Sequence, residues 1–432
     1  MKQKAEQIFL AGVQSVLPDR LIRNSLKIGD NTLYVNKKRF NLSDFENVFV
    51  LGMGKASALM AKEIENIFGE RITGGHVVTK YGHGTELQRI SLTEAGHPIP
   101  DANGIAGTKK ILEIARNATQ NDLVICLISG GASALLADFP SGASLDDLKR
   151  TNELLVTCGA DIHEINTVRK HLSHVKGGQL AQAIYPATTI GLILSDVVGD
   201  KLNVIASGPT VADTSTFADA MSVVEKYKLP LSAPMARYLE KGLRGDVPET
   251  PKSTDKIFGR VHNFLIGSNR IALQAAAEKA DNIGFESHII TDTLQGDVLD
   301  VAEYILRIIQ NFQQERKPLC LLFGGEPTVH VSGKGLGGRN QHLALYLATR
   351  ISGRQNIAIL CAGTDGTDGP TDAAGAVIDN ETVADAAKKN IEPQIFLQNS
   401  DSYRFFQRVG GHIITGNTRT NVMDMVVVLM NN

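Results

Sequence analysis

The sequence lacks a surplus of either charge: 44 Lys and Arg residues stand against 46 Asp and Glu residues, a formal net charge of −2 over 432 residues. A chain without a basic surplus has no electrostatic footprint for nucleic acid, and no acidic tail is present. We therefore expect no nucleic-acid partner.

Cysteine is also scarce, with four residues in the chain. Cys126, Cys320 and Cys361 lie in apolar stretches that suit buried strands, and no two cysteines have zinc or redox spacing. The sequence therefore predicts a reduced, intracellular protein, and we expect it in the cytoplasm.

Long hydrophobic runs are absent as well, and none approaches the roughly 18 residues that a membrane-spanning helix needs. Near the N-terminus, Ile8, Phe9, Val13 and Val16 are spaced as the apolar face of an amphipathic helix that ends at Pro18. This segment lacks the continuous apolar core of a signal peptide. We expect no membrane partner.

Glycine is abundant, with 41 residues, and the glycines cluster directly after strand-like segments. Strand-like and helix-like segments alternate in two blocks, which is typical of α/β domains. Between the blocks, over residues 229–256, the periodicity fades and prolines accumulate. We predict an N-terminal Rossmann-like α/β domain over residues 1–240 and a second α/β domain over residues 256–432.

One glycine turn follows the strand-like segment Val48–Leu51 and places Lys55 at the start of a helix-like segment. It fits neither the Walker A spacing nor the dinucleotide fingerprint, which needs a third glycine where Ser57 stands. A lysine at the positive end of a helix dipole is unfavourable unless an anion binds there. Lys55 is a candidate anion-binding residue, with a solvated lysine in an ordinary turn as the alternative.

Three further features occur in the N-terminal half. The turn Ser129–Ser133 combines small residues and hydroxyls, which suits an anion held by backbone N–H groups, although a plain tight turn explains it equally well. Asp196 ends a strand-like segment, where a general base or magnesium ligand is favoured over a helix cap. Asn166, Arg169 and Lys170 lie one helical turn apart, a pattern usually typical of a solvated face.

The C-terminal half repeats this arrangement. Glu326 ends a strand-like segment, and Arg339 follows two glycines at the start of a helix, where its planar fork suits a carboxylate or phosphate. Asp365, Asp368 and Asp372 lie in a segment of small residues, which suits a hard cation such as Mg²⁺. Three separate turn caps are the alternative. Cations, carboxylates and anion-binding turns in two domains together indicate phosphoryl transfer in a cleft between the domains.

Six segments, taken together, resemble the motifs of the glycerate 2-kinase family, which carries a C-terminal MOFRL domain and whose members have also been described as hydroxypyruvate reductases. The segments are GMGKAS, SGGASALL, NTVRKHLSHVKGGQLA, LSDVVGD with IASGPT, GGEPTV with GGRNQ, and AGTDGTDGPTDAAGA. The resemblance spans about Phe9 to Val428. It implies two α/β domains facing a cleft and ATP-dependent phosphorylation of D-glycerate on its 2-hydroxyl, with a divalent cation.

The resemblance also implies site residues. The catalytic residues would be Lys55, Asp196 and Arg339: we expect Asp196 to take the proton from the 2-hydroxyl, and the two cations to hold the glycerate carboxylate and the charge on the moving phosphoryl group. The residues expected at the ATP phosphates are Ser129, Gly130, Gly131, Ser133, Lys176, Gly177 and Gly178. The residues expected at glycerate are Gly54, Lys55, Arg339, Asn340 and Asp365. The residues expected at Mg²⁺ are Asp196, Asp365 and Asp368.

Four positions depart from the family pattern and leave substrate selectivity open: Ala132, His342, Asn417 and Arg419. One alternative function is an NAD(P)H-dependent hydroxypyruvate reductase, disfavoured by the missing third glycine and by the lack of an acidic residue roughly 20 residues further on. A kinase for a related hydroxy acid and a non-catalytic binding protein are the others. We expect a monomer or a homodimer.

Overall fold

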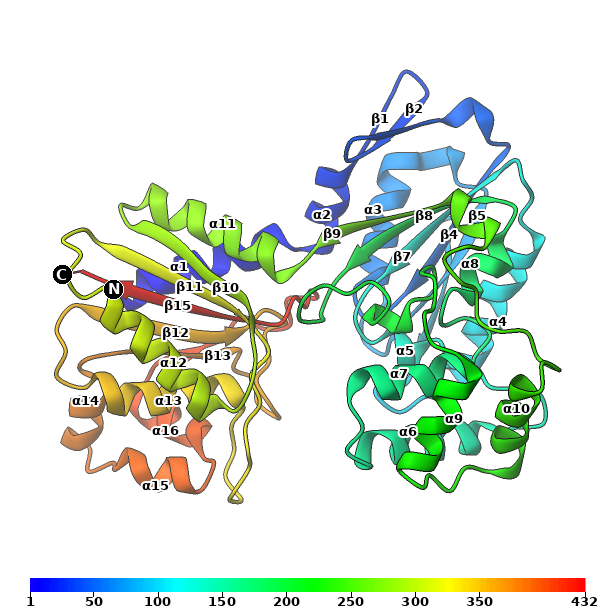
Figure 1. Cartoon of the computed structure of the whole chain (residues 1–432). Coiled ribbons are helices and arrows are strands. Elements are labelled where there is room, and N and C mark those ends of the chain that lie inside the picture. The colour runs from blue at the N-terminus through cyan, green and yellow to red at the C-terminus, as the bar shows by residue number, and fades with distance from the viewer. Residues whose placement is uncertain (432) are drawn as a thin grey trace. The chain divides into compact units, whose positions relative to one another are not determined.

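The structure, a computed structural model, describes residues 1–431 (Figure 1). It divides into two compact units, each made of separated stretches of the chain. Unit 1 comprises Met1–Arg20, Asp196–Gly199 and Gly267–Asn432; unit 2 comprises Leu21–Ser195 and Asp200–Ile266. The predicted α/β class is confirmed for both units.

Unit 2 is built on a six-stranded sheet of order β6-β5-β4-β7-β8-β9. The strands are β4 (Asn47–Met53), β5 (Gly74–Lys80), β6 (Ser91–Ala95), β7 (Asp122–Ile128), β8 (Thr188–Leu194) and β9 (Val261–Gly267). Pairing from β6 through β8 is parallel, and every residue of β7 is buried, as expected for a sheet covered on both faces. The carboxyl ends of these strands therefore meet at one edge, which is where α/β sheets bind ligands.

Helices pack around this sheet and also form a helical lobe with its own apolar cluster, which includes Leu155, Val168, Phe217 and Met235. The helices near the sheet are α3 (Ser57–Phe68), α4 (Ala102–Asn117), α5 (Ala132–Leu135) and α8 (Gln179–Ile184). The helices of the lobe are α6 (Leu145–Thr157), α7 (Ile162–His171), α9 (Phe217–Lys226) and α10 (Ala233–Leu243). A separate antiparallel sheet contains β1 (Leu26–Gly29), β2 (Thr32–Val35) and β3 (Lys38–Asn41).

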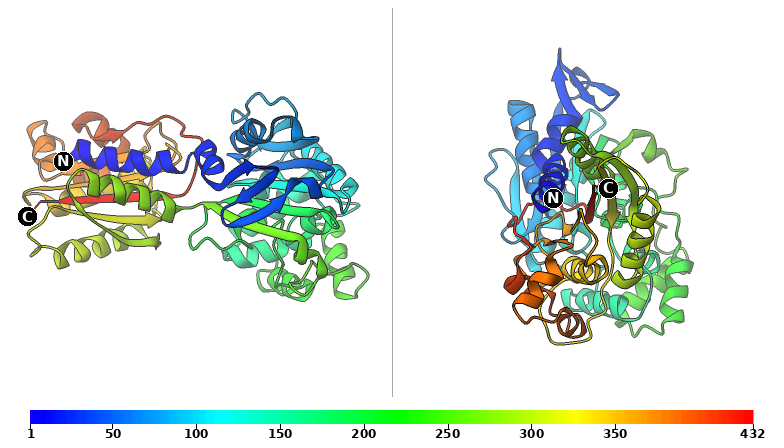
Figure 2. Two further views of the ribbon diagram at one scale, coloured as in Figure 1. Left: turned by 90° about the horizontal axis from the view of Figure 1, so that it is seen from above. Right: turned by 90° about the vertical axis from the view of Figure 1, so that its left-hand side faces the viewer.

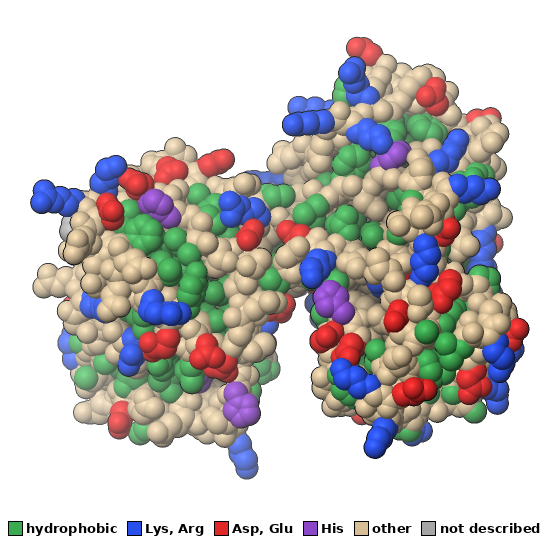
Figure 3. All heavy atoms as spheres, viewed as in Figure 1, with side chains coloured by type: hydrophobic (Ala, Val, Ile, Leu, Met, Phe, Trp, Pro, Cys, Tyr) green, Lys and Arg blue, Asp and Glu red, His purple; other side chains and the backbone are tan. Residues whose placement is uncertain are grey.

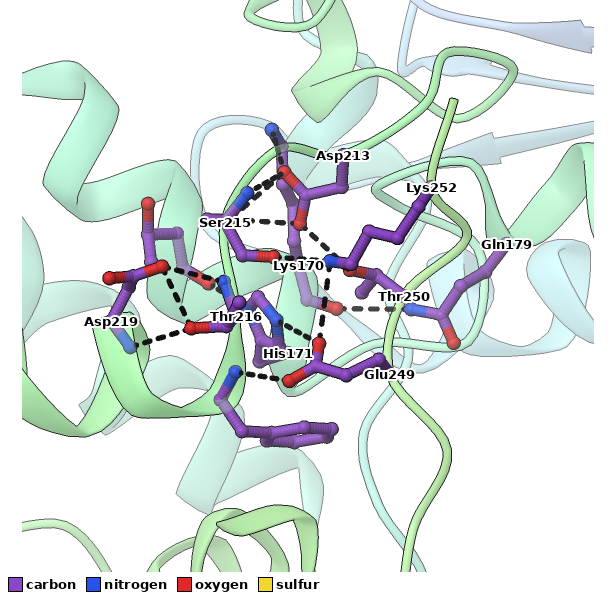
Figure 4. Close-up of polar contacts among 12 residues, drawn as sticks. Lys170, His171, Gln179, Asp213, Ser215, Thr216, Asp219, Glu249, Thr250 and Lys252 are labelled. Atoms are coloured by element: carbon purple, nitrogen blue, oxygen red, sulfur yellow. Dashed lines mark hydrogen bonds and ion pairs between the residues drawn. The ribbon is translucent and has the colours of Figure 1, made fainter. Parts of the chain in front are cut away.

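The segment expected to separate the two domains is part of unit 2, where α10 packs into the apolar cluster of the lobe and a polar network binds the residues near its end (Figure 4). The buried Lys170 pairs with Asp213 at 3.0 Å, and Asp213 accepts a hydrogen bond from Thr250 at 3.0 Å. Lys252 in turn donates to Thr250 at 2.9 Å. Buried charges need such partners. The stripe around Lys170 is therefore not a solvated face.

Unit 1 has a mixed sheet of order β10-β11-β15-β12-β13-β14. Its strands are β10 (Glu286–Leu294), β11 (Leu319–Gly325), β12 (Ile357–Gly363), β13 (Gly375–Asp379), β14 (His412–Ile413) and β15 (Asp424–Met430). Strands β10 and β11 are parallel, whereas β15 runs antiparallel to both of its neighbours. Its helices are α11 (Asn269–Asn282), α12 (Val298–Asn311), α13 (Arg339–Ile351), α14 (Thr382–Lys388), α15 (Pro393–Gln398) and α16 (Ser402–Val409).

The expected N-terminal amphipathic helix is α1 (Lys2–Ser15), and it packs beside α11 on the sheet of unit 1 (Figures 1 and 2). Its buried face includes Ile8, Phe9 and Val13. At Gly12, a side-chain carbon would lie 2.9 Å from the carbonyl oxygen of Ala272, so glycine permits the close approach of the two helices. The short helix α2 (Pro18–Ser25) follows. The first 20 residues thus group with unit 1.

Charged side chains of both signs are interspersed over the face seen in Figure 3. Among residues 1–431, none of the helices combines the length and apolar character needed to cross a bilayer.

Candidate functional site

Two glycine turns at the edge of the unit 2 sheet brace one another. Strands β4 and β7 are parallel neighbours in register from Asn47 to Met53, so the turns that follow them emerge side by side. The Lys55 backbone N–H donates to the Gly130 carbonyl oxygen at 2.9 Å, and the Ala56 N–H donates to Ser129 Oγ at 3.1 Å. The backbone of Lys55 is therefore fixed by the second turn.

Glycine is required at two positions of this bracing. Gly54 has φ +114°, and a side chain there would overlap the Ser129 carbonyl group. Gly131 has φ +83°, and a side-chain carbon there would lie 3.0 Å from the His97 ring and 3.3 Å from Lys55 Cε. The absence of a side chain at Gly131 thus lets both His97 and Lys55 lie close to the backbone of this residue.

His97 is a further candidate site residue, which the sequence reasoning missed. Its pKa is lowered to about 4, chiefly by burial and further by the positive charges of Lys55 and Lys80. The imidazole is therefore neutral at physiological pH beside a cationic side chain. In the described part of the chain, no ion pair joins Lys55 to a carboxylate. The Lys55 ammonium is thus a positive charge without a protein counter-ion, as an anion-binding group requires.

The structure corrects the expectation for Lys176, Gly177 and Gly178. The Lys176 ammonium is buried, where it donates to the Leu136 carbonyl oxygen at 2.8 Å and pairs with Asp138 at 3.3 Å. The N–H groups of the two glycines donate to carbonyl oxygens of residues 207 and 208 at 2.9 and 2.8 Å. These donors are already used within the protein, so they do not form a phosphate cradle.

The Ser129–Ser133 turn has backbone hydrogen-bond donors that are available to a ligand. Within residues 1–431, the backbone N–H groups of Gly130 and Gly131 make no hydrogen bond to the protein. The hydroxyl of Ser133 lies 2.9 Å from that of Ser207, which donates to Asn166 Oδ1 at 2.9 Å. Ser129 is fully buried and its N–H and hydroxyl brace the neighbouring turn, so its role here is to support Lys55.

The polar site of unit 1 is centred on Arg339, the first residue of α13. Because β15 runs antiparallel to β11 and β12, its first residue, Asp424, lies at the edge where those two strands end. The Arg339 guanidinium donates to both Asp424 oxygens, at 2.6 and 3.0 Å, and contacts Glu326 at 3.1 Å. The sequence reasoning missed Asp424, whose only signal is an acidic residue at the start of an apolar strand.

Burial changes the pKa values of Arg339 and its two carboxylate partners. It raises the pKa of Asp424 and of Glu326, although Arg339 opposes the shift in both. Burial also acts to lower the pKa of Arg339, but its two carboxylate partners raise it overall. The guanidinium is therefore permanently charged and held in a fixed orientation.

Asp368 does not present its carboxylate as a metal ligand. One oxygen accepts the Asn340 N–H at 3.0 Å, and the other accepts the N–H and the side-chain amide of Gln341 at 2.8 and 3.0 Å. Asp368 is buried, which raises its pKa to about 6. It anchors the N-terminus of α13, which corrects its expected role as a direct Mg²⁺ ligand.

Asp365 is half-buried, and its Oδ1 accepts the Thr367 N–H at 3.1 Å. Thr418 donates to the Asp365 carbonyl oxygen at 3.2 Å, which places the loop that carries Arg419 beside this turn. In the part of the chain that the structure describes, no three His, Cys, Asp or Glu side chains converge to hold a metal ion. A cation would therefore be shared with ligand oxygens rather than held by a protein cage.

Asp196 lies two residues beyond the end of β8, as the strand pattern predicted, in the short stretch that groups with unit 1. Two of the departures from the family pattern, Asn417 and Arg419, are exposed, whereas Ala132 and His342 are buried.

The chain is similar to known proteins over its whole length. The family described as "Domain of unknown function (DUF4147)" matches residues 4–240, and the MOFRL family matches residues 319–424. Glycerate 2-kinase of Pyrococcus horikoshii is 45% identical over 427 residues, covering 97% of this chain and 94% of the relative. D-glycerate 2-kinase of Thermotoga maritima is 39% identical and covers 100% of this chain and 98% of the relative.

Two solved structures are also similar to this chain over nearly its whole length. The crystal structure of a P. horikoshii protein matches with a TM-score of 0.88 at 43% identity, covering 100% of this chain and 98% of that one. The crystal structure of T. maritima glycerate kinase matches with a TM-score of 0.89 at 38% identity, covering 99% of each chain.

The relatives of this chain are kinases, and the turn that carries Lys55 does not have the Walker A spacing, so the protein is a kinase that is not of the Walker type. The chain belongs to the glycerate 2-kinase family. The resemblance drawn from its motifs and the predicted MOFRL domain are confirmed.

Proposed function

We propose that this protein transfers the γ-phosphoryl group of ATP to the 2-hydroxyl of D-glycerate, giving 2-phosphoglycerate. The observation that carries this proposal is Lys55, a cation without a protein counter-ion whose backbone is locked between two glycine turns. Phosphoryl transfer depends mostly on positioning and on neutralising charge, which such a residue supplies.

Each part of the site has a role in this scheme. The free N–H groups of Gly130 and Gly131, with the Ser133 hydroxyl, bind phosphate oxygens. Lys55 stabilises the negative charge on the moving phosphoryl group. Asp196 accepts the proton of the 2-hydroxyl as that oxygen attacks.

Arg339 binds the glycerate carboxylate. Asp424 holds one edge of the guanidinium, while the edge that faces Glu326 is available to a second carboxylate, because the Glu326 side chain is 45% exposed and can turn away. The planar fork of arginine suits this bidentate recognition. Asn340, the next residue of α13, and Asp365, whose charge acts on both Glu326 and Asp424, are the other residues that we propose at glycerate.

Mg²⁺, when bound, neutralises charge on the ATP phosphates. Asp365 and Asp196 are the carboxylates that would share the ion with those phosphates. Asp368 keeps its part in anchoring α13 and does not bind the ion. We propose cytoplasmic ATP and D-glycerate as the partners of the enzyme.

The test is NMR analysis of the product formed from D-glycerate and Mg·ATP. A phosphorus signal coupled to the proton on carbon 2, together with release of ADP, is the expected result. Oxidation of NADH with hydroxypyruvate, without ADP release from glycerate, would instead establish the reductase. Phosphorylation of a related hydroxy acid with no turnover of glycerate would reassign the substrate.

A further inference from the structure

A cavity of about 680 Å³ opens within unit 2, beside the Ser129–Ser133 turn. Its walls come from the loop of residues 97–100, the turn, α6 and α7. The volume lies inside the range of roughly 300–1,000 Å³ that is typical of small-molecule sites. It is much larger than a three-carbon acid needs, so glycerate alone would leave most of it unfilled.

The wall on α7 carries a cation without a counter-ion. Arg169 is half-buried, and its Nε donates to Asn152 Oδ1 at 2.9 Å. Burial lowers its pKa, and within residues 1–431 it forms no ion pair with a carboxylate. A partly buried charge without an ion-pair partner destabilises the folded protein unless a ligand supplies the opposite charge. Arg169 therefore marks an anion position inside the cavity.

The cavity also reaches the proposed reaction centre. Gly131 and Ser133 line it, and Gly131 lies against both His97 and the Lys55 side chain. Phosphate groups bound along this wall would thus lead from Arg169 toward Lys55.

The lining of the cavity combines the charged Lys149 and Glu153 with exposed apolar side chains. Ile99 is 66% exposed and Val156 is 65% exposed, and both line the cavity together with Pro98 and Pro100. Single exposed apolar side chains are ordinary, but Pro98, Ile99 and Val156 are all exposed and line one cavity, which indicates a surface that a flat apolar group covers.

We propose that this cavity binds the nucleoside triphosphate, with the base and ribose against Ile99 and Val156 and the phosphates along Ser133 and Arg169. The assignment rests on the proposed phosphoryl transfer, and it identifies Arg169 and Val156 as nucleotide-binding residues. Glycerate then binds outside this cavity.

Calorimetry with the analogue AMP-PNP and Mg²⁺, combined with separate KM values for ATP and glycerate, tests the assignment. Val156→Glu places a negative charge at the exposed mouth without disturbing the core, and Arg169→Ala removes the cation. We expect each variant to weaken AMP-PNP binding about tenfold or more and to raise the KM for ATP by a similar factor, with little change in the KM for glycerate.

Ile162→Glu and Arg150→Ala are the matched controls, since both residues are exposed on the same two helices and do not line the cavity. These controls should bind AMP-PNP as the unchanged protein does. Unaltered AMP-PNP binding in Val156→Glu, or a rise in the KM for glycerate alone in Arg169→Ala, would overturn the assignment. AMP-PNP binding that the variants weaken, in a protein that does not phosphorylate glycerate, would reject the proposed reaction but keep the nucleotide site.

Discussion

The Arg339 guanidinium donates two hydrogen bonds to the Asp424 carboxylate, with Nε 2.6 Å from Oδ2 and Nη2 3.0 Å from Oδ1. Lysine cannot reproduce two parallel hydrogen bonds and a third contact to Glu326. We expect Arg339→Lys to lower kcat/KM by about 10²-fold or more, as loss of a transition-state contact does. Steady-state kinetics measures this, with the exposed Arg350→Lys on the same helix as the control; activity equal to that control would contradict the role of Arg339.

Asp424 acts through Arg339 and is a positioning residue. Asp424→Asn keeps the shape of the side chain but removes the charge and one acceptor, so the guanidinium loses its fixed orientation. We expect kcat to fall about tenfold or more, and the effects of Asp424→Asn and Arg339→Lys to be non-additive in a double-mutant cycle. Independent, additive losses would show that Asp424 has a separate role.

Lys55→Ala removes a cation that has no carboxylate partner while leaving the bracing of its turn, which uses only backbone atoms of residue 55. We expect kcat to fall by about 10²-fold or more with an unchanged melting temperature. Lys62→Ala, on the exposed side of the following helix, is the matched control. A near-normal kcat in Lys55→Ala would remove the basis of the proposed mechanism.

His76 makes the stability of the protein depend on pH. Its side chain is fully buried, Nδ1 lies 2.7 Å from Ser91 Oγ, and burial lowers its pKa from 6.5 to about 4. The unfolded chain binds the proton more readily, so stability is full above pH 6.5 and falls as the pH drops toward 4. The loss reaches roughly 3 kcal/mol for this group.

Urea denaturation followed at pH 7 and near pH 4 measures this loss. In His76→Gln the difference between the two pH values should be smaller, because glutamine does not titrate. An equal pH dependence in both proteins would exclude His76 as a source of the acid sensitivity.

Asp368→Ala separates an anchoring role from metal binding. The variant leaves the N–H groups of Asn340 and Gln341 without their acceptor, so we expect a loss of about 1–3 kcal/mol of stability even in EDTA. Chemical denaturation measures it. A direct metal ligand would instead leave the stability in EDTA unchanged and raise the concentration of Mg²⁺ needed for activity.

The alternation of strand and helix patterns was enough to predict both α/β folds, because apolar periodicity reports burial directly. It also placed Lys55 and Arg339 at sheet edges, since each follows a strand and a glycine turn. Asp424 could not be predicted as a site residue, because the local sequence does not reveal the direction of a strand in its sheet. Only the antiparallel pairing of β15 brings its first residue to the end of β11.

Burial of polar groups was the other source of error. A lysine beside two glycines has the same local pattern whether it faces solvent or pairs with a distant carboxylate, and Asp138 lies 38 residues from Lys176 in the sequence. Likewise, the stretch near Thr250 is attached to unit 2 in part by a side-chain hydrogen bond to Asp213, which no local sequence pattern reveals.

The place of β15 in its sheet has a consequence for synthesis and engineering. This strand is the last in the sequence, yet it lies between β11 and β12 near the middle of the sheet of unit 1. Unit 2 can complete its sheet while the ribosome is still translating unit 1, whereas α1 must wait for the final strand before its apolar face is fully covered. A deletion within β15 therefore acts on the centre of a core rather than on the edge of a sheet.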